Sequence, residues 1–191
     1  MRPLTVIVAA TVCVIGTIGL TGCTPPISGS TGISVDADGH PVIVLAWCGD
    51  AAPDGVHISH HEDASGRPLA DAPDGPSPAA TSVDDVNLTA PYLRGRSAAV
   101  RLDAPAYGWS AEPRPLVLRP GVRYHAFGYR GRGHGQVNTQ YLDFSAERVA
   151  RLTPDTVLIQ RADERRSPPA SADAVISREE FARQGRDAAD C

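Results

Sequence analysis

Residues 41–47 have the sequence Pro41-Val42-Ile43-Val44-Leu45-Ala46-Trp47, which is apolar at every position. The length suits a β-strand, in which successive side chains point to opposite faces of the sheet. Because both alternating sets of side chains are apolar, such a strand has to be covered on both faces. The stretch therefore predicts a central strand of a β domain.

Short apolar runs separated by turn-forming residues continue on both sides of this stretch, which is typical of an all-β domain. Residues 56–59 alternate, with Val56 and Ile58 on one face and His57 and Ser59 on the other. We expect strands at residues 33–35, 41–47, 56–59, 98–102, 116–118, 122–129, 137–142 and 157–159. Seven or eight short strands indicate a β-sandwich.

Two stretches depart from the strand pattern. Residues 62–82 contain four Pro and are predicted to form a long surface insertion. Residues 177–189 begin with a capping-box pattern at Ser177 and are predicted to form a short helix anchored by Phe181. A second short helix is expected at residues 145–152.

The N-terminus has the layout of a secretory signal, with a cationic start, an apolar core and small residues at its end. Its last residues, Leu20-Thr21-Gly22-Cys23, resemble the bacterial lipobox, in which the Cys receives a diacylglyceryl group and becomes the first residue after cleavage. The resemblance implies a signal peptide at residues 1–22 and a lipoprotein anchored to the extracytoplasmic face of the cell membrane through acyl chains on Cys23. The alternatives are a transmembrane anchor and an ordinary cleaved signal.

Cleavage would leave a tether at residues 23–32, the sandwich at residues 33–143 and an extension at residues 144–191 packed on the sandwich. After cleavage, the remaining chain would carry 17 Arg, because Arg2 leaves with the signal peptide. It would have no Lys and 22 acidic residues, for a net charge of −5. An acidic chain does not suit nucleic acid, which needs a cationic face. The lack of Lys excludes every mechanism that needs a catalytic lysine.

Two cysteines remain once Cys13 leaves with the signal and Cys23 carries lipid. Outside the cytoplasm, Cys48 and Cys191 are expected to form a structural disulfide. The bond would close a long loop and contribute on the order of 5 kcal/mol in the chain-entropy picture. The alternative, a thiol pair that cycles in redox chemistry, lacks the Cys-x-x-Cys spacing typical of such pairs.

Two short motifs carry a further resemblance. Leu118-Arg119-Pro120-Gly121-Val122-Arg123-Tyr124 is similar to the Leu-x-Pro-Gly-x-x-Tyr stretch of fibronectin type III domains. Val44 to Trp47, followed by Pro53-Asp54-Gly55-Val56, is similar to the second strand of that family and the loop after it. The resemblance covers residues 33–142 and implies an immunoglobulin/fibronectin-III-like sandwich. In it, Trp47 and Tyr124 share one core, and the Tyr124 hydroxyl bonds back to the backbone.

The chain as a whole resembles the small lipoproteins of actinobacteria to which no activity is assigned. The resemblance rests on the lipobox, the composition and the terminal Cys191. It implies a location in the cell envelope and no particular activity.

Three histidines, His57, His60 and His61, lie beside Glu62 and Asp63 and are the densest group of potential metal ligands. On a strand, His57 and His61 share one side while His60 points to the other, so a site would need ligands from elsewhere. His57 and His61 are therefore weak candidates for metal ligands. The alternative is that these residues only form the end of a strand that leads into a polar loop. The chain after the signal has no Met for a soft metal, and we expect neither a metal nor a cofactor.

The segment around Arg130-Gly131-Arg132-Gly133-His134-Gly135 is a cationic loop between two expected strands. Such loops are a usual place for partner binding in a sandwich. Tyr129, Arg130, Arg132 and His134 are therefore the candidate partner-binding residues, and the alternative is a hairpin tip without function.

The sequence contains none of the common catalytic templates, neither Gly-x-Ser-x-Gly, His-Glu-x-x-His, Ser-x-x-Lys nor a phosphate-binding Gly loop. We therefore expect a non-catalytic binding or structural module of the cell envelope, whose partner is an envelope protein or ligand and not nucleic acid. Two alternatives stay open, a metal or small-ligand carrier that uses residues 57–63 and a hydrolase whose catalytic residues meet only in space.

Overall fold

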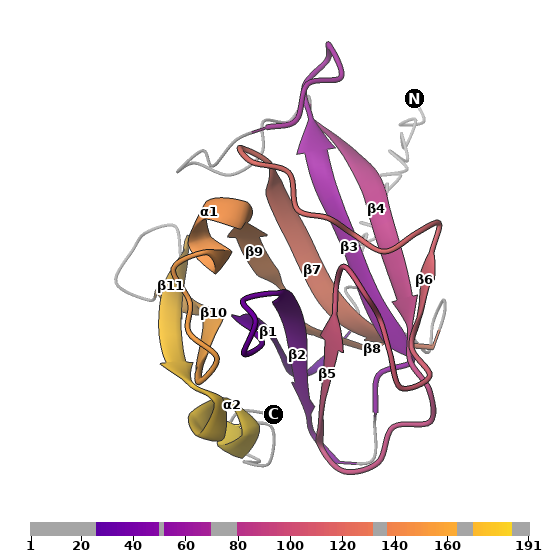
Figure 1. Ribbon diagram of the computed structural model, residues 1–191, viewed down its shortest axis with the longest axis vertical. Coiled ribbons are helices and arrows are strands. Elements are labelled where there is room, and N and C mark those ends of the chain that lie inside the picture. The colour runs from indigo at the N-terminus through magenta and orange to yellow at the C-terminus, as the bar shows by residue number, and fades with distance from the viewer. Residues whose placement is uncertain (1–25, 50–51, 70–79, 132–136, 164–169, 185–191) are drawn as a thin grey trace, which may run out of the picture.

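The computed structural model describes residues 26–49, 52–69, 80–131, 137–163 and 170–184 (Figure 1). The fold is all-β, since strands form most of this part of the chain and its two helices are short. The strands are β1 (Ile27–Val35), β2 (Pro41–Trp47), β3 (Gly55–Glu62), β4 (Thr81–Thr89), β5 (Ser97–Arg101), β6 (Ser110–Glu112), β7 (Arg123–Arg130), β8 (Val137–Gln140), β9 (Leu142–Ser145), β10 (Thr156–Asp163) and β11 (Ala170–Ser177). The helices are α1 (Ala146–Val149) and α2 (Arg178–Gln184).

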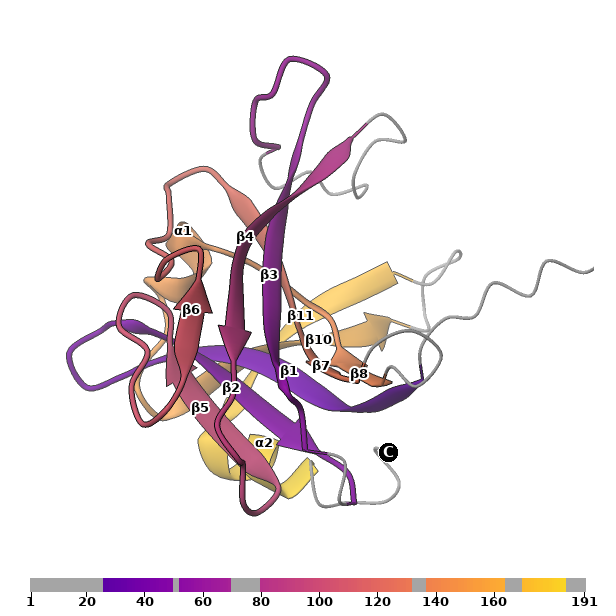
Figure 2. The same cartoon turned by 90° about the vertical axis from the view of Figure 1, so that its right-hand side faces the viewer.

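The strands form one hydrogen-bonded sheet that curls so that its two halves face each other (Figures 1 and 2). One half has the order β5-β2-β1-β10-β11, and all of its pairs are antiparallel. The other half contains β6-β4-β3-β7, with β9 beside the first part of β7. Strand β8 joins the halves, because it pairs antiparallel with β7 and parallel with β1. In Figure 2, β3 and β4 run across the direction of β1 and β2.

The main core lies between the two halves of the sheet. It includes Trp47, Tyr124 and Phe144, which are almost fully buried, and apolar side chains from most of the strands. Tyr124 and Phe144 stack with ring centroids 5.6 Å apart. The backbone N–H of Arg119 donates a hydrogen bond of 2.9 Å to the Tyr124 hydroxyl, so the polar end of this buried ring is satisfied.

Strand β2 is buried on both faces, as its sequence predicts. Ile43, Leu45 and Trp47 point into the main core. The opposite side chains, with Val157 and Ile159 of β10, form a second apolar cluster that is covered by Phe181 of α2. Gly32 of β1 permits this packing, since a Cβ there would lie only 2.4 Å from Val157 Cγ1.

Both predicted helices are present, and α1 is shorter than the expected range of 145–152, whereas residues 185–189 of the other expected helix lie outside the described residues. In α2, the Ser177 hydroxyl accepts a hydrogen bond of 3.1 Å from the Glu180 N–H, as the capping pattern predicts. Phe181 is buried, which confirms its expected role as the anchor of this helix. Helix α1 is a single turn that places Val149 against the main core.

The structure differs from several expectations about the strands. Residues 116–118 form no strand, although Leu116 is buried. The expected strand at 137–142 is broken at Tyr141 into β8 and β9. Strands β4, β6 and β11 were not expected, because polar and small residues dominate them, as in Thr-Ser-Val-Asp-Asp-Val-Asn-Leu-Thr of β4.

Two expected boundaries also shift. Strand β1 begins at Ile27, inside the stretch predicted as a tether. The C-terminal region contributes more than a helical extension, since β10 pairs with β1 and β11 pairs with β10. The apolar residues of β10 therefore complete the sheet as well as the core.

Several expected features lie outside the described residues. They are the signal peptide at 1–22, Cys23, residues 70–79 of the Pro-rich insertion, Arg132, His134 and Cys191. In the part of the chain that the structure does describe, no helix has both the length and the apolar character needed to span a membrane.

Candidate functional site

Strand β3 separates its three histidines between the two faces of the sheet, as the alternation predicts. His57 and His61 are partly exposed on the outer face, whereas His60 is only 3% exposed and points inward. The two faces therefore have to be considered as separate sites.

The outer face carries five rings, which we call the ring face: His57, His61, His125, Phe127 and Tyr141. They come together because β7 lies beside β3, with Phe127 opposite His57, and Tyr141 directly precedes β9. His125 stacks on Tyr141 at 4.8 Å, and Phe127 meets the edge of Tyr141 at 4.9 Å. His57 and His61 extend the group across β3, at 5.3 Å from Phe127 and 6.5 Å from His125. All five rings remain partly exposed.

Asp143 of β9 fixes the position of His125. Its carboxylate accepts a hydrogen bond of 2.6 Å from His125 Nδ1 and another from Arg123 on the same strand as His125. Burial opposes ionisation of Asp143, but these hydrogen bonds and the charges of Arg123 and His125 outweigh it and lower the pKa of Asp143 to about 2. The carboxylate is therefore ionised at neutral pH and holds one imidazole edge in place.

The two histidines of β3 differ in how they are held. Both ring nitrogens of His57 have partners, with Nδ1 at 2.9 Å from Asn87 Oδ1 and Nε2 at 3.3 Å from Asp84 Oδ1. His61 has no side-chain hydrogen bond within the described residues. Burial, followed by the nearby charge of His125, lowers the pKa of His61 below its ordinary value, so its ring is neutral at pH 7.

The inner face holds a compact polar cluster around His60. Its Nδ1 lies 2.7 Å from Asp85 Oδ2, and its Nε2 lies 3.2 Å from Glu62 Oε1 and 3.3 Å from an Arg119 nitrogen. A β-bulge in the pairing of β3 with β4 produces this arrangement, because Asp84 lies opposite Ser59 while Asp85 is the extra residue. Two adjacent carboxylates therefore serve opposite faces of the sheet.

The two alternatives that the sequence left open, a metal or small-ligand carrier and a hydrolase, concern residues on these faces. No group of three or more His, Cys, Asp or Glu is placed to hold a metal ion within the described residues. Ser59, His125 and Asp143 lie opposite one another on three neighbouring strands. Among the hydrogen bonds of the described residues, however, His125 bonds Asp143 and not Ser59.

The candidate partner loop is described only at its start. Tyr129 lies against Gly55 of β3, where a Cβ would be 2.7 Å from the Tyr129 hydroxyl. Arg130 is exposed at the end of β7, and Asp54 accepts a hydrogen bond of 2.8 Å from the Gly131 N–H. Tyr129 is thus held on the sheet.

Sequence reasoning identified the β3 histidines but missed His125, Phe127, Tyr141 and Asp143. The alternation of residues 122–129 already places His125 and Phe127 on one face of a strand. Strand register places these two residues beside β3, and it also places Asp143 beside His125. No short stretch of sequence indicates this register.

Comparison of the chain with models of protein families, with curated proteins and with solved structures gives no match.

Proposed function

We propose that this protein is an exported lipoprotein, held on the extracytoplasmic face of the cell membrane through Cys23, and that its β domain is a non-catalytic binding module. The ring face is the surface that binds, and its partner is another protein of the cell envelope. The observation that carries this proposal is the group of five partly exposed rings in mutual contact on the outer face of a sheet.

The composition of the ring face suits a protein partner. Aromatic side chains and Arg are enriched at the centres of protein interfaces, because they bury a large area for few rotatable bonds. Here Phe127 and Tyr141 lie at the centre, with Arg123 and Asp143 at one side. The ion pairs order His125 before binding, so little conformational entropy is lost when a partner docks.

The position of the first strand supports an anchor close to the domain. Ile27, where β1 begins, follows Cys23 by four residues. Four residues reach at most about 14 Å, so a lipid on Cys23 would hold the sheet near the headgroups. The binding surface would then face other proteins at the same membrane.

For the fold, we propose a fibronectin-III-like sandwich. Supporting observations are the pairing of β1, β2 and β5 in one half and of β4, β3, β7 and β9 in the other. The bond from the Arg119 N–H to the Tyr124 hydroxyl has the form of a tyrosine corner. Strands β10 and β11 are then additions at the edge of the first half.

We also propose the disulfide between Cys48 and Cys191. Cys48 directly follows β2, and α2 packs on the outer face of β2 through Phe181. Cys191 follows the end of α2 by seven residues, a length that reaches at most about 25 Å. The bond would hold the C-terminal end of the chain to the central strand.

Site-specific photo-crosslinking in intact cells tests the proposed function. A photoreactive phenylalanine analogue is introduced at Tyr141 on the ring face and, as a matched control, at Tyr92, which is 88% exposed in the loop after β4. We expect a discrete adduct of defined mass from Tyr141 and none from Tyr92. Membranes are the source of the sample, and Cys23→Ser should release the protein from them.

The same experiment can reject the proposal. Phe127→Ala removes the ring that contacts both His57 and Tyr141, so it should abolish the Tyr141 adduct while the protein stays in the membrane fraction. Adducts of the same mass and yield from Tyr92 and Tyr141, or an adduct unaffected by Phe127→Ala, would show that the ring face is not the binding surface.

A further inference from the structure

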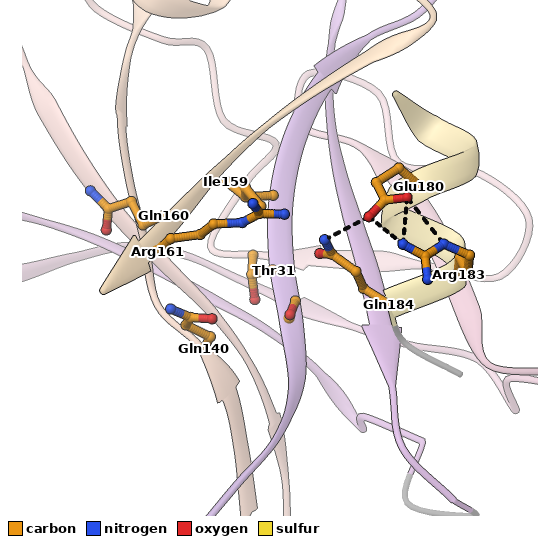
Figure 3. A pocket seen from close by; sticks show the side chains of 9 residues that line it. Thr31, Gln140, Ile159, Gln160, Arg161, Glu180, Arg183 and Gln184 are labelled. Carbon is orange, nitrogen blue, oxygen red and sulfur yellow. Dashed lines mark hydrogen bonds and ion pairs between the residues drawn. The ribbon is translucent and has the colours of Figure 1, made fainter. Parts of the chain in front are cut away.

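A second site lies where the curled sheet splits. Strand β1 first pairs in parallel with β8, where Ser30 lies opposite Gln140, and farther along it pairs with β10 at Ile33 and Leu158. A groove lies where β1 passes from one neighbour to the other, and it is lined by residues of β1, β8 and β10. Helix α2 closes its far side (Figure 3).

The groove has a volume of about 490 Å³, within the range of small-molecule sites. Eight of its nine lining residues are polar, and Ile159 is the apolar one. The longer polar side chains in the lining are those of Gln140, Gln160, Arg161, Glu180, Arg183 and Gln184. A wall of this kind suits a hydrogen-bonding ligand and does not suit an apolar one.

The described lining of the groove contains three charged side chains, those of Arg161, Glu180 and Arg183. Arg183 holds Glu180 through three contacts of 2.6 to 3.1 Å, and Gln184 adds a hydrogen bond of 3.2 Å to the same carboxylate. The Arg183 hydrogen bonds are the main cause of the lowered pKa of Glu180, so this carboxylate is ionised and neutralised by its neighbour. Among the described lining residues this leaves Arg161 as the remaining charged group, and its charge also helps to lower the pKa of Glu180.

Arg161 is placed to bind an anionic ligand. Figure 3 shows its side chain extending from β10 toward the middle of the groove. Its side chain is exposed, and the ion pairs found among the described residues do not include it, although its charge acts on Glu180. Guanidinium groups bind carboxylate and phosphate oxygens in pairs, which makes Arg161 suited to an anionic group.

Two carboxamides, those of Gln140 and Gln160, also line the groove. No hydrogen bond of either side chain is found within the described residues, although Gln160 as a whole is only 7% exposed. Arg178 Nε is the one buried side-chain polar atom without a partner in this part of the chain, so both amides are open to water, which a ligand can replace. The neighbouring Thr31 hydroxyl is already engaged, by Thr139 and the Gly128 N–H.

We propose that this groove binds a small polar anion, namely a molecule in which a carboxylate or phosphate group is joined to several hydroxyls. Arg161 binds the anionic group, and the carboxamides of Gln140 and Gln160 bond the hydroxyls. This site is separate from the ring face, and its ligand does not depend on the protein partner proposed there.

Calorimetric titration of the purified protein tests the proposal with three probes: glucuronate, glycerol 3-phosphate and uncharged glucose. We expect at least one of the two anions to bind, at least tenfold more tightly than glucose. Whichever anion binds more tightly identifies the source of the charge as a carboxylate or a phosphate.

Variants locate the binding. Arg161→Gln should weaken the binding of that anion at least tenfold, and Arg161→Lys should restore only part of it, because an ammonium cannot form the paired contact. Arg114→Gln, which removes an exposed arginine from the loop before β7, is the matched control and should leave binding unchanged. Thermal unfolding of each variant checks that it is folded.

The proposal is overturned if neither anion binds, if glucose binds as tightly as the anions, or if Arg161→Gln and Arg114→Gln weaken binding equally. None of these outcomes bears on the crosslinking at Tyr141, so the two proposals can fail independently.

Discussion

The two faces of strand β3 use similar residues for different purposes. On the inner face, His60 is buried and all of its polar atoms have partners in Asp85, Glu62 and Arg119. On the outer face, His61 is partly exposed and has no side-chain hydrogen bond within the described residues. The two histidines are adjacent in the sequence, so composition alone does not distinguish them.

The difference shows how burial decides the role of a polar group. A buried imidazole is tolerated only when its hydrogen bonds are made, and it then contributes to the stability of one particular arrangement. A partly exposed imidazole can keep a nitrogen available for a partner, because water satisfies it in the free protein. We therefore expect substitutions on the inner face to change stability, and substitutions on the ring face to change binding.

The largest expected effect comes from the adjacent carboxylates of β4. Asp85→Ala leaves Nδ1 of buried His60 without its partner, and we expect a loss of about 3 kcal/mol in the free energy of unfolding. Asp84→Ala is the matched control, because Asp84 is 71% exposed and contacts only partly exposed His57. Its loss should stay below about 1 kcal/mol. Urea unfolding, with unchanged m-values, measures both.

Equal losses for the two variants would mean that the bulge does not direct Asp84 and Asp85 to opposite faces. In a His60→Leu background the loss caused by Asp85→Ala should become smaller, because the short contact of Asp85 is with the imidazole and its contact with Arg119 is longer.

A smaller effect is expected from pH and Asp143. Its pKa is lowered from 3.8 to about 2 in the folded protein, so the native state favours the ionised form. The stability that this shift contributes is fully present above about pH 4 and is lost as the pH falls through 2. It amounts to about 2 kcal/mol. Asp143→Asn should remove this part of the pH dependence, which urea unfolding of both proteins at about pH 6, 4 and 2.5 measures.

Other carboxylates with lowered pKa, such as Asp103, add to the acid sensitivity of both proteins equally. The difference between the two proteins therefore isolates Asp143. A constant difference over this pH range would mean that His125 and Arg123 do not stabilise the ionised carboxylate.

Local patterns predicted much of the fold. The apolar run at 41–47 predicted the central strand, alternation at 56–59 predicted both faces of β3, and the cap at Ser177 predicted α2. Each of these features depends on residues that are close in the sequence, or only on the alternation of side chains between the two faces of a strand. Strand β4 gave no such signal, because a polar strand beside β3 has the composition of a loop.

The sites were harder to predict for a physical reason. Asp143 reaches His125 across a strand pair, and Gln140 and Gln160 line one groove because β1 pairs with β8 near its start and with β10 farther along. Register and splitting of a sheet depend on packing over the whole domain, so no short motif encodes them. The histidines of β3 could therefore be predicted as candidate site residues from the sequence, whereas the residues that complete the ring face could not.

The smallest expected effect concerns the charge of His61. Burial and the nearby His125 lower its pKa below the ordinary value of 6.5, so in acid the unfolded chain takes up this proton before the folded protein does. His61 therefore reduces stability slightly as the pH falls through 6.5, by less than Asp143 contributes. NMR titration of the imidazole should give a pKa below 6.5 in the wild type and a higher value in His125→Gln, which removes a neighbouring positive charge. An unchanged pKa in that variant would mean that the two rings do not interact, and the ring face would then be a set of separate side chains rather than one surface.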